Sequence, residues 1–239
     1  MTVRRFYVPP DAFGDSIRLG EDESRHLSKV LRLGPGDEVR LFDGHGRESI
    51  FAIEDPDRRR VPIRFVKDTQ PSAPESGLDL TLAVPLLKKS NTELVLQKAV
   101  ELGVKRFVPL ICARGEVAAK KWKAGRSHRI AVESAKQCGR ATVPEIAEPI
   151  DFERFIVEHQ GTAFLFHEAE GGPLPDKFEG GALIAVTGPE GGWEDSEVEL
   201  AAAGGFTVVH FGGRILRAET AAIAVTAILQ HRFGDMNER

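Results

Sequence analysis

Cysteine is scarce in this sequence, and long apolar runs are absent. Only Cys112 and Cys138 occur among 239 residues, which gives neither a disulfide framework nor the ligand spacing of a zinc site. We therefore expect a reduced, cytoplasmic setting and no bound metal. The longest apolar runs have the length of a strand, well short of the roughly 20 residues of a membrane helix, so no membrane span is expected. The start, Met1 to Arg5, is not followed by an apolar segment, which predicts no secretory signal.

An excess of positive charge is also lacking, because the formal net charge is −4. This balance argues against a protein that is covered with nucleic acid over most of its surface. Between Arg114 and Arg140, however, eight Lys and Arg stand against two Glu. This stretch is compatible with binding to RNA phosphates and equally with a solvated helix face.

The first seventy residues have the pattern of a small β-barrel. Short β-rich runs occur at 4–8, 39–42, 49–53 and 62–66, with dense turn signals between them. Residues 21–33 have apolar positions near helical spacing and predict one helix. The stretch 68–77 is poor in apolar residues and contains two prolines, which is typical of a linker. We therefore expect one domain over 1–70 and a second over 71–239.

The second part of the chain alternates between strands and helices. Strands are expected at 78–84, 106–111, 163–166, 183–187 and 207–211, and helices at 90–102, 124–138, 152–159 and in a run that ends at 233. Ser90 is expected at the N-cap of one helix, and Gly103 just after its end. This alternation predicts an α/β fold with a parallel sheet covered by helices.

Two glycine loops, at 188–193 and 212–220, each follow a β-rich run and lead into a helix. Neither has the Lys and Ser/Thr of a P-loop, and the first breaks the dinucleotide spacing at Pro189, which also removes a backbone donor. Backbone-rich loops at the carboxyl ends of strands suit a flat, neutral or cationic ligand such as adenine. The alternative is a pair of tight turns with no ligand.

The two loops resemble the paired signature of the ribosomal RNA small subunit methyltransferase E family of SPOUT, or trefoil-knot, methyltransferases. Gly188 to Gly192 and Arg214 to Ala221 carry the resemblance, and 26–32, 101–104 and 133–140 extend it over most of the chain. It implies a PUA-like RNA-binding barrel over 1–70 and a SPOUT domain over 71–239 with a deep trefoil knot at roughly 163–233. It also implies methylation of N3 of a uridine in 16S ribosomal RNA.

The resemblance implies S-adenosylmethionine as cofactor. The adenine would meet main-chain groups of both loops, and the residues after the preceding strand would form a third wall. The implied cofactor-binding residues are His167, Glu168, Thr187, Gly188, Pro189, Glu190, Gly191, Gly192, Phe211, Gly212, Ile215, Leu216, Arg217, Thr220 and Ala221. A homodimer is expected as well, from the resemblance and from a wide apolar stripe in the last helix, formed by Ala221, Ala222, Val225, Ile228 and Leu229.

Methyl transfer to uridine N3 spreads negative charge onto O2 and O4 as the proton leaves. A cation beside these oxygens would stabilise the charge, and Arg217 is the first candidate, with Arg214 second. A carboxylate, Glu190 or Glu219, would accept the proton; His167 is a weaker candidate. For Glu219 the alternative is an acid at a helix start that is favoured by the helix dipole.

Cations that could bind RNA are spread over both parts of the chain. The candidates are Arg4, Arg5, His26, Arg32, Arg114, Lys120, Arg126 and Arg140. Three mild departures from the family pattern occur at Gly115, Cys138 and Phe211, none of them at a catalytic position, although Gly115 weakens the case for an RNA contact by its loop. The resemblance implies 16S ribosomal RNA as the partner, either naked or in the assembled small subunit.

Two other functions are compatible with the same residues. One is a non-catalytic RNA-binding or ribosome-assembly protein of this fold, which need not bind the cofactor. The other is a SPOUT methyltransferase that acts on another RNA, such as transfer RNA. The amino-terminal barrel and the run from Arg214 to Thr220 argue against the second of these, and cofactor binding in isolation would distinguish the first.

Overall fold

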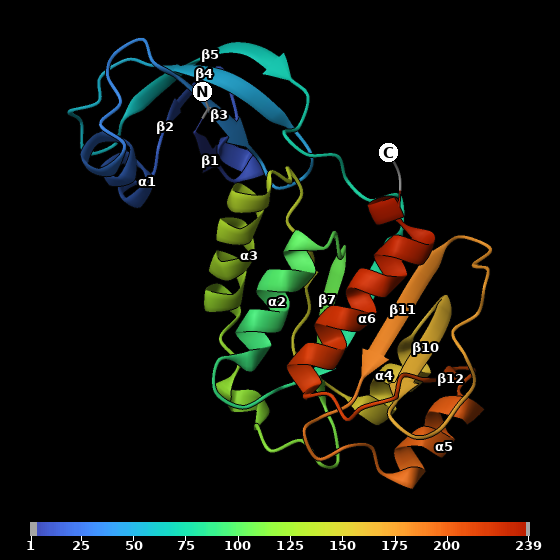
Figure 1. Cartoon of the computed structure of the whole chain (residues 1–239). Helices are drawn as coiled ribbons and strands as arrows, with labels where there is room; N and C mark the ends of the chain where they lie inside the picture. Colours follow the sequence, from blue (N-terminus) through green and yellow to red (C-terminus); the bar gives the residue numbers. More distant parts are fainter. Residues whose placement is uncertain (1–3, 238–239) are drawn as a thin grey trace. The chain divides into compact units, whose positions relative to one another are not determined.

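The structure is a computed structural model, and it describes residues 4–237. The chain divides into two compact units (Figure 1). The first contains the residues up to Glu75 together with Ala135–Val143, and the second contains Ser76–Ser134 and the residues from Pro144 onward. Each unit has its own sheet and its own apolar core.

The first unit is built around a curled five-stranded sheet, as the β-rich pattern predicts. The strand order is β1-β3-β4-β5-β2, and only the β1–β3 pair is parallel. A register shift at Ile50 and Phe51 interrupts the pairing of β4 with β5, an irregularity that bends and twists a strand. The sheet encloses a core that includes Phe6, Leu41 and Phe51. The strands are β1 (Arg5–Tyr7), β2 (Ser16–Arg18), β3 (Glu38–Phe42), β4 (Glu48–Ile53) and β5 (Pro62–Thr69).

Three local features of this unit differ from the sequence prediction. The expected helix is shorter: α1 (Glu21–Arg25) continues as a π-helical turn, η2 (His26–Val30), and Arg32 beyond it has φ 54°, which a right-handed helix cannot contain. Strand β5 extends into the expected linker because Asp68 pairs with Ser49 of β4 and accepts its hydroxyl hydrogen bond at 2.7 Å. Strand β2 was not predicted, since three residues are too short for a periodic signal.

A buried carboxylate connects this sheet to the segment that returns to the first unit. The side chain of Glu48 is fully buried and accepts hydrogen bonds from Arg5 at 2.8 Å and from Arg40 at 2.9 Å. Arg5 also donates to the carbonyl oxygens of Ala135 and Arg140, at 2.8 and 2.9 Å. Burial by itself raises the pKa of Glu48, but the hydrogen bonds from the two arginines outweigh it and hold the pKa below the ordinary 4.5.

The second unit is a parallel sheet, as the alternation of strands and helices predicts. The order is β12-β10-β11-β6-β7-β8, with β9 also paired to β7, and every pair is parallel. Nearly every residue of β6 and β11 is buried, as expected for strands covered on both faces. The strands are β6 (Asp79–Pro85), β7 (Arg106–Ile111), β8 (Glu145–Ile146), β9 (Ile150–Asp151), β10 (Thr162–His167), β11 (Ala182–Thr187) and β12 (Thr207–His210).

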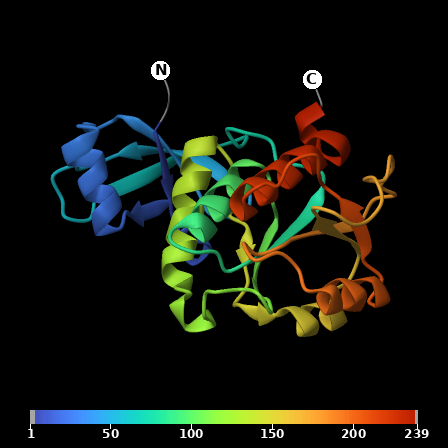
Figure 2. The same cartoon turned by 60° about the horizontal axis from the view of Figure 1, so that its bottom comes forward.

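Helices α2 and α6 pack on one face of this sheet, and α4 and α5 pack on the other (Figure 2). Helix α2 begins after Ser90 as predicted, although the Ser90 side chain makes no capping hydrogen bond. Gly103 follows its end with φ 80°, which confirms the predicted left-handed residue. The longer helices are α2 (Asn91–Glu101), α3 (Ala124–Cys138), α4 (Phe152–Glu158), α5 (Asp195–Ala203) and α6 (Ala218–Phe233). Short 3-10 turns are η1 (Pro10–Ala12), η3 (Ala119–Lys121) and η4 (Asp235–Asn237).

The parallel arrangement brings the ends of four neighbouring strands to one edge of the sheet. Strands β6, β10, β11 and β12 end at Pro85, His167, Thr187 and His210. In open α/β sheets this carboxyl edge is where ligands bind.

Across residues 4–237, no helix has both the length and the apolar character needed to cross a membrane.

Candidate active site

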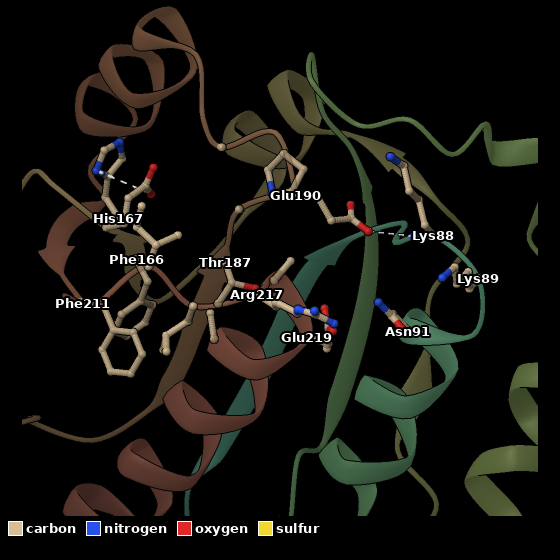
Figure 3. A pocket seen from close by; sticks show the side chains of 18 residues that line it. Lys88, Lys89, Asn91, Phe166, His167, Thr187, Glu190, Phe211, Arg217 and Glu219 are labelled. Atoms are coloured by element: carbon tan, nitrogen blue, oxygen red, sulfur yellow. Dashed lines mark hydrogen bonds and ion pairs between the residues drawn. The ribbon is translucent and has the colours of Figure 1, made fainter. Parts of the chain in front are cut away.

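A cavity of about 470 Å³ lies at the carboxyl edge, and the loops after all four strands form its wall (Figure 3). This volume falls within the range of about 300–1,000 Å³ that is typical of small-molecule sites. The cavity belongs entirely to the second unit. Two of its four loops are the glycine loops that the sequence singles out.

The first glycine loop curves over a buried tryptophan. Trp193 is 4% exposed, and its Nε1 donates a hydrogen bond to the carbonyl oxygen of Phe166 at 3.1 Å. A Cβ atom at Gly188 would stand 3.0 Å from the same Nε1. Gly192 has φ 72° and donates its backbone N–H to the carbonyl oxygen of Pro189 at 3.0 Å. Glycine is therefore needed at 188, where the backbone passes between the indole and the cavity.

Two side chains brace this loop from outside the cavity. Arg114 follows β7 and donates to the carbonyl oxygen of Trp193 at 3.1 Å. Gly191 packs on the stem of Arg114, so that a Cβ atom there would stand 3.0 Å from the arginine Cβ. Glu197 is 7% exposed and accepts the backbone N–H at the N-cap of α5 and that of Ala113. These bonds fix the loop to the end of β7, so its shape is preorganised.

The second glycine loop, which begins at Gly212, also passes close to its own strand. A Cβ atom at Gly212 would overlap the ring of His210, and Gly213 has φ 98°. Ile215 lines the cavity although it is 91% exposed. An apolar side chain therefore stands at the opening of the cavity.

One end of the cavity is aromatic. The rings of Phe166 and Phe211 meet edge to face, with centroids 5.8 Å apart. His167 lies beyond them at the end of β10 (Figure 3), and Glu168, the next residue, also lines the cavity. The His167 Nδ1 accepts the backbone N–H of Ala169 at 3.0 Å, so this ring has a fixed orientation.

The other end of the cavity is polar. Arg217 occupies the N-cap position of α6, and Figure 3 shows its guanidinium directed toward Asn91 and away from the phenyl rings. Within residues 4–237 this guanidinium has neither an ion-pair nor a hydrogen-bond partner. The carboxylate of Glu190 accepts the backbone N–H of Lys88 at 2.9 Å. Glu219 lies in the first turn of α6 and lines the same end.

The cavity brings together most residues that the sequence assigns to the cofactor. Those on its wall are His167, Glu168, Thr187, Gly188, Pro189, Glu190, Gly192, Phe211, Ile215, Leu216, Arg217 and Ala221. Gly191 and Gly212 of the two loops and Thr220 in the first turn of α6 do not form part of the wall. Three of the four catalytic candidates line the cavity, and Arg214 does not.

Five further wall residues, Lys88, Lys89, Asn91, Phe166 and Ala218, are not among the site residues that the sequence assigns. Three of them follow β6, which lies about a hundred residues before the glycine loops. Only the pairing of β6 with β11 brings them to the same place. In the sequence, the only sign of these residues is a pair of lysines shortly after the expected end of the strand. This sign points to the cavity only when the sheet order is known, because the order places that strand end beside the glycine loops.

The predicted RNA contacts fall into two groups. The exposed residues are Arg4, His26, Arg32, Arg114, Lys120 and Arg126. Arg5 and Arg140 are different, because their side chains are only 8% and 4% exposed. Arg140 donates from Nε to Glu75 at 2.9 Å, and Arg5 is bound to Glu48 and to backbone carbonyls. We infer that these two arginines hold the first unit together.

Comparison with known proteins identifies the family. Residues 74–230 match the model of the RNA methyltransferase domain, and residues 19–66 match that of the RNA methyltransferase PUA domain. Ribosomal RNA small subunit methyltransferase E of Synechocystis sp. is 31% identical over 95% of this chain and 77% of its own length. The chain belongs to the ribosomal RNA small subunit methyltransferase E family.

Other members of the family agree in length and in fold. The Rickettsia conorii enzyme is 30% identical, over 97% of this chain and 96% of its own. The crystal structure of the Neisseria gonorrhoeae enzyme bound to S-adenosyl methionine has a TM-score of 0.90 and 32% identity, and covers 98% of this chain and 99% of its own. The predicted α/β class with a PUA-like amino-terminal part is confirmed. The roles of individual site residues stay predictions.

Proposed function

We propose that this protein methylates small-subunit ribosomal RNA, with S-adenosylmethionine as methyl donor and N3 of a uridine in 16S ribosomal RNA as acceptor. The observation that carries the proposal is the cavity at the carboxyl edge, where both glycine loops meet one unpaired arginine and three carboxylates. Family membership supports ribosomal RNA as the substrate. The Neisseria gonorrhoeae enzyme was crystallised with S-adenosyl methionine, which supports the cofactor.

The cavity fits this cofactor in its size and in the chemistry of its wall. The edge-to-face pair of Phe166 and Phe211 provides an apolar surface for a flat adenine ring. The backbone of the Gly188–Gly192 loop offers hydrogen-bonding groups at close range. The carboxylates of Glu168 and Glu190 line the cavity, and their negative charge would favour a cofactor whose sulfonium is positively charged. The cofactor supplies an electrophilic methyl group, and the protein must orient it and manage the charge on the base.

Arg217 is positioned to stabilise the negative charge that develops on the uracil ring. Its guanidinium has no internal partner within the described residues, and it projects into the polar end of the cavity. A planar guanidinium can donate two parallel hydrogen bonds, one to a carbonyl oxygen of the uracil ring and one to the ring atom beside it. It also stays charged at neutral pH. The start of α6 adds the partial positive charge of a helix N-terminus at the same place.

Glu190 is the first candidate to accept the proton from N3. One carboxylate oxygen is held by the Lys88 backbone N–H, which leaves the other oxygen available at the polar end of the cavity. Glu219 is the second candidate. Its place in the first turn of α6 also has a structural explanation, because acidic residues are favourable there.

We also propose that the protein acts as a homodimer, in the cytoplasm where ribosomes are assembled. Of the apolar stripe in α6, Ala222, Val225 and Leu229 are fully buried within the subunit, whereas Ile228 is 40% exposed. Leu94 of α2, the helix packed beside α6, is 38% exposed. A second copy would cover this apolar surface. Light scattering should give twice the chain mass of 26.2 kDa, and a monomer at working concentration would contradict the proposal.

The proposed activity is tested with methyl-labelled cofactor and purified RNA. Small ribosomal subunits and deproteinised 16S ribosomal RNA are taken from cells that lack the protein, with large-subunit RNA and transfer RNA as controls. Label should enter small-subunit RNA and neither control. Transfer to transfer RNA alone would overturn the substrate, and the absence of both cofactor binding and transfer would favour a non-catalytic RNA-binding protein.

A further inference from the structure

A second cavity lies next to the first at the carboxyl edge. Its volume is about 520 Å³, and its wall comes from the segment after β6, the start of α2 and residues 116–127. Because β6 and β7 are neighbouring parallel strands, this cavity continues the row of strand ends beyond the cofactor cavity. Lys88 and Lys89 line both cavities, so they form the boundary between them.

The second cavity combines an apolar base with an aromatic ring. Leu86, Leu87 and Leu96 line it and are at most 4% exposed. Trp122 also lines it, and its Nε1 is shielded from solvent without a hydrogen-bond acceptor in the described part of the chain. A buried indole N–H normally has a partner. These features suit a flat heterocycle that carries acceptor atoms.

The rim of this cavity is basic. Its charged residues are Lys88, Lys89, Lys121, Lys123 and Arg126 against Glu93 and Glu116. The two carboxylates are neutralised, because Arg126 pairs with Glu93 and Lys88 pairs with Glu116. Lys89, Lys121 and Lys123 have no ion pair within residues 4–237. Unpaired lysines around such a cavity suit phosphate groups.

The backbone at the boundary between the two cavities is unusual. Lys89 has φ 55°, and Arg32 is the only other non-glycine residue with positive φ in the described chain. Such a conformation costs on the order of 1–3 kcal/mol and is found preferentially at ligand sites. Lys89 keeps this costly left-handed conformation at a place where its side chain lines both cavities.

We propose that the second cavity binds a nucleotide of the substrate RNA next to the nucleotide whose base enters the cofactor cavity. The neighbouring base lies against Trp122, and the phosphate between the two nucleotides passes over Lys88 and Lys89. Lys121 and Lys123 contact the phosphate on the far side. A base must leave its stack to reach an enclosed site, and holding its neighbour apart keeps it unstacked. This inference rests on the proposed function and specifies how the substrate strand is held.

The first test replaces the ring of Trp122. Binding of small ribosomal subunits from cells that lack the protein is measured for the wild type, Trp122→Ala and Trp122→Phe. Trp122→Ala should weaken binding by about five- to a hundredfold, as for the loss of one stacked base, and Trp122→Phe should retain most of the affinity. Calorimetric titration with S-adenosylmethionine should give unchanged affinity for both, because Trp122 does not line the cofactor cavity.

The second test measures how affinity depends on salt. Replacing Lys121 and Lys123 together by Ala removes two phosphate contacts, which should lower the slope of log affinity against log salt by about 1.4–1.8. Lys105→Ala is the control, because it removes one lysine charge just before β7, at the opposite edge of the sheet. Its slope should equal that of the wild type.

The outcomes separate this inference from the proposed function. If Trp122→Ala binds subunits as the wild type does, the second cavity is not a nucleotide site, while methyl transfer by the wild type leaves the proposed function intact. If Trp122→Ala also loses cofactor affinity, the variant lacking Lys121 and Lys123 becomes the deciding test. A salt slope equal to that of the wild type would then overturn the inference. If the wild type neither binds nor methylates ribosomal RNA, both proposals fail.

Discussion

The carboxylate of Glu190 accepts the backbone N–H of Lys88 at 2.9 Å, although the two residues are 102 positions apart in the chain. The bond connects the first glycine loop to the segment after β6, and these loops meet because β6 and β11 are adjacent strands. It closes one side of the polar end of the cavity. Glu190 therefore has a structural task in addition to its proposed role in proton transfer.

The two tasks of Glu190 can be separated by substitution. Glu190→Gln keeps an acceptor for the Lys88 N–H, so cofactor affinity should stay near that of the wild type. Methyl transfer should fall by about a hundredfold to ten-thousandfold, the range for loss of a general base. Glu190→Ala should lose both properties. Single-turnover transfer beside calorimetric titration measures them, and a wild-type rate in the Gln variant would move the proton acceptor to Glu219.

Arg217→Ala should lower methyl transfer with little loss of cofactor affinity. Losing one group that stabilises developing charge typically costs about 2.7–4 kcal/mol, or roughly a hundred- to thousandfold in rate. Arg217→Lys should rescue poorly, because an ammonium lacks the planar fork. Arg214→Ala is the matched control, since Arg214 lies in the same loop but outside the cavity wall. Loss of cofactor binding in Arg217→Ala would instead make Arg217 a binding residue.

Gly188→Ala should destabilise the protein and weaken cofactor binding. The new Cβ atom would stand 3.0 Å from Trp193 Nε1, and overpacking of this kind typically costs about 1–3 kcal/mol. Gly125→Ala is the control, because a Cβ atom there meets nothing within 4 Å. Thermal unfolding and cofactor titration are the measurements. Equal results for the two variants would show that the first glycine loop tolerates a side chain.

Stability of the first unit should fall at acid pH through Glu48. Burial opposes its ionised form, but hydrogen bonds from Arg5 and Arg40 hold its folded-state pKa below 4.5. The unfolded chain therefore takes up the proton first as the pH falls. The contribution of Glu48 is complete above pH 4.5 and is lost as the pH drops through the folded-state value.

Glu48→Gln tests this pH dependence. Breaking a buried ion pair costs on the order of 3–5 kcal/mol, so the variant should be clearly less stable than the wild type at neutral pH. Urea unfolding at a series of pH values gives the difference in the free energy of unfolding between the two proteins. That difference should shrink as the pH falls below 4.5. A constant difference would contradict the assignment.

Most strands and helices of the second unit were predictable because their signals are local, whereas the two-residue strands β8 and β9 are too short for a periodic signal and were not predicted. Apolar runs of strand length alternate with helical periodicity, and β7 and α3 have the predicted bounds. The two glycine loops were recognisable for the same reason. Sheet order is not local, so the contribution of Lys88, Lys89 and Asn91 to the cavity could not be read from the sequence.

Burial of charged residues was equally hard to predict. Arg5 and Arg140 resemble exposed cations in the sequence, and their partners Glu48 and Glu75 lie 43 and 65 positions away. The return of Ala135–Val143 to the first unit has no signal in composition. The trefoil knot at roughly 163–233 rests on the family resemblance alone and stays a prediction.

The most direct test of this account identifies the nucleoside that the protein modifies. Small subunits from cells lacking the protein are incubated with purified protein and S-adenosylmethionine, and their 16S ribosomal RNA is digested and analysed by mass spectrometry against nucleoside standards. We expect 3-methyluridine to appear at a single position with the wild type and to be absent with Arg217→Ala. A methyl group on a ribose, on another base atom or on no nucleoside at all would contradict the proposed function.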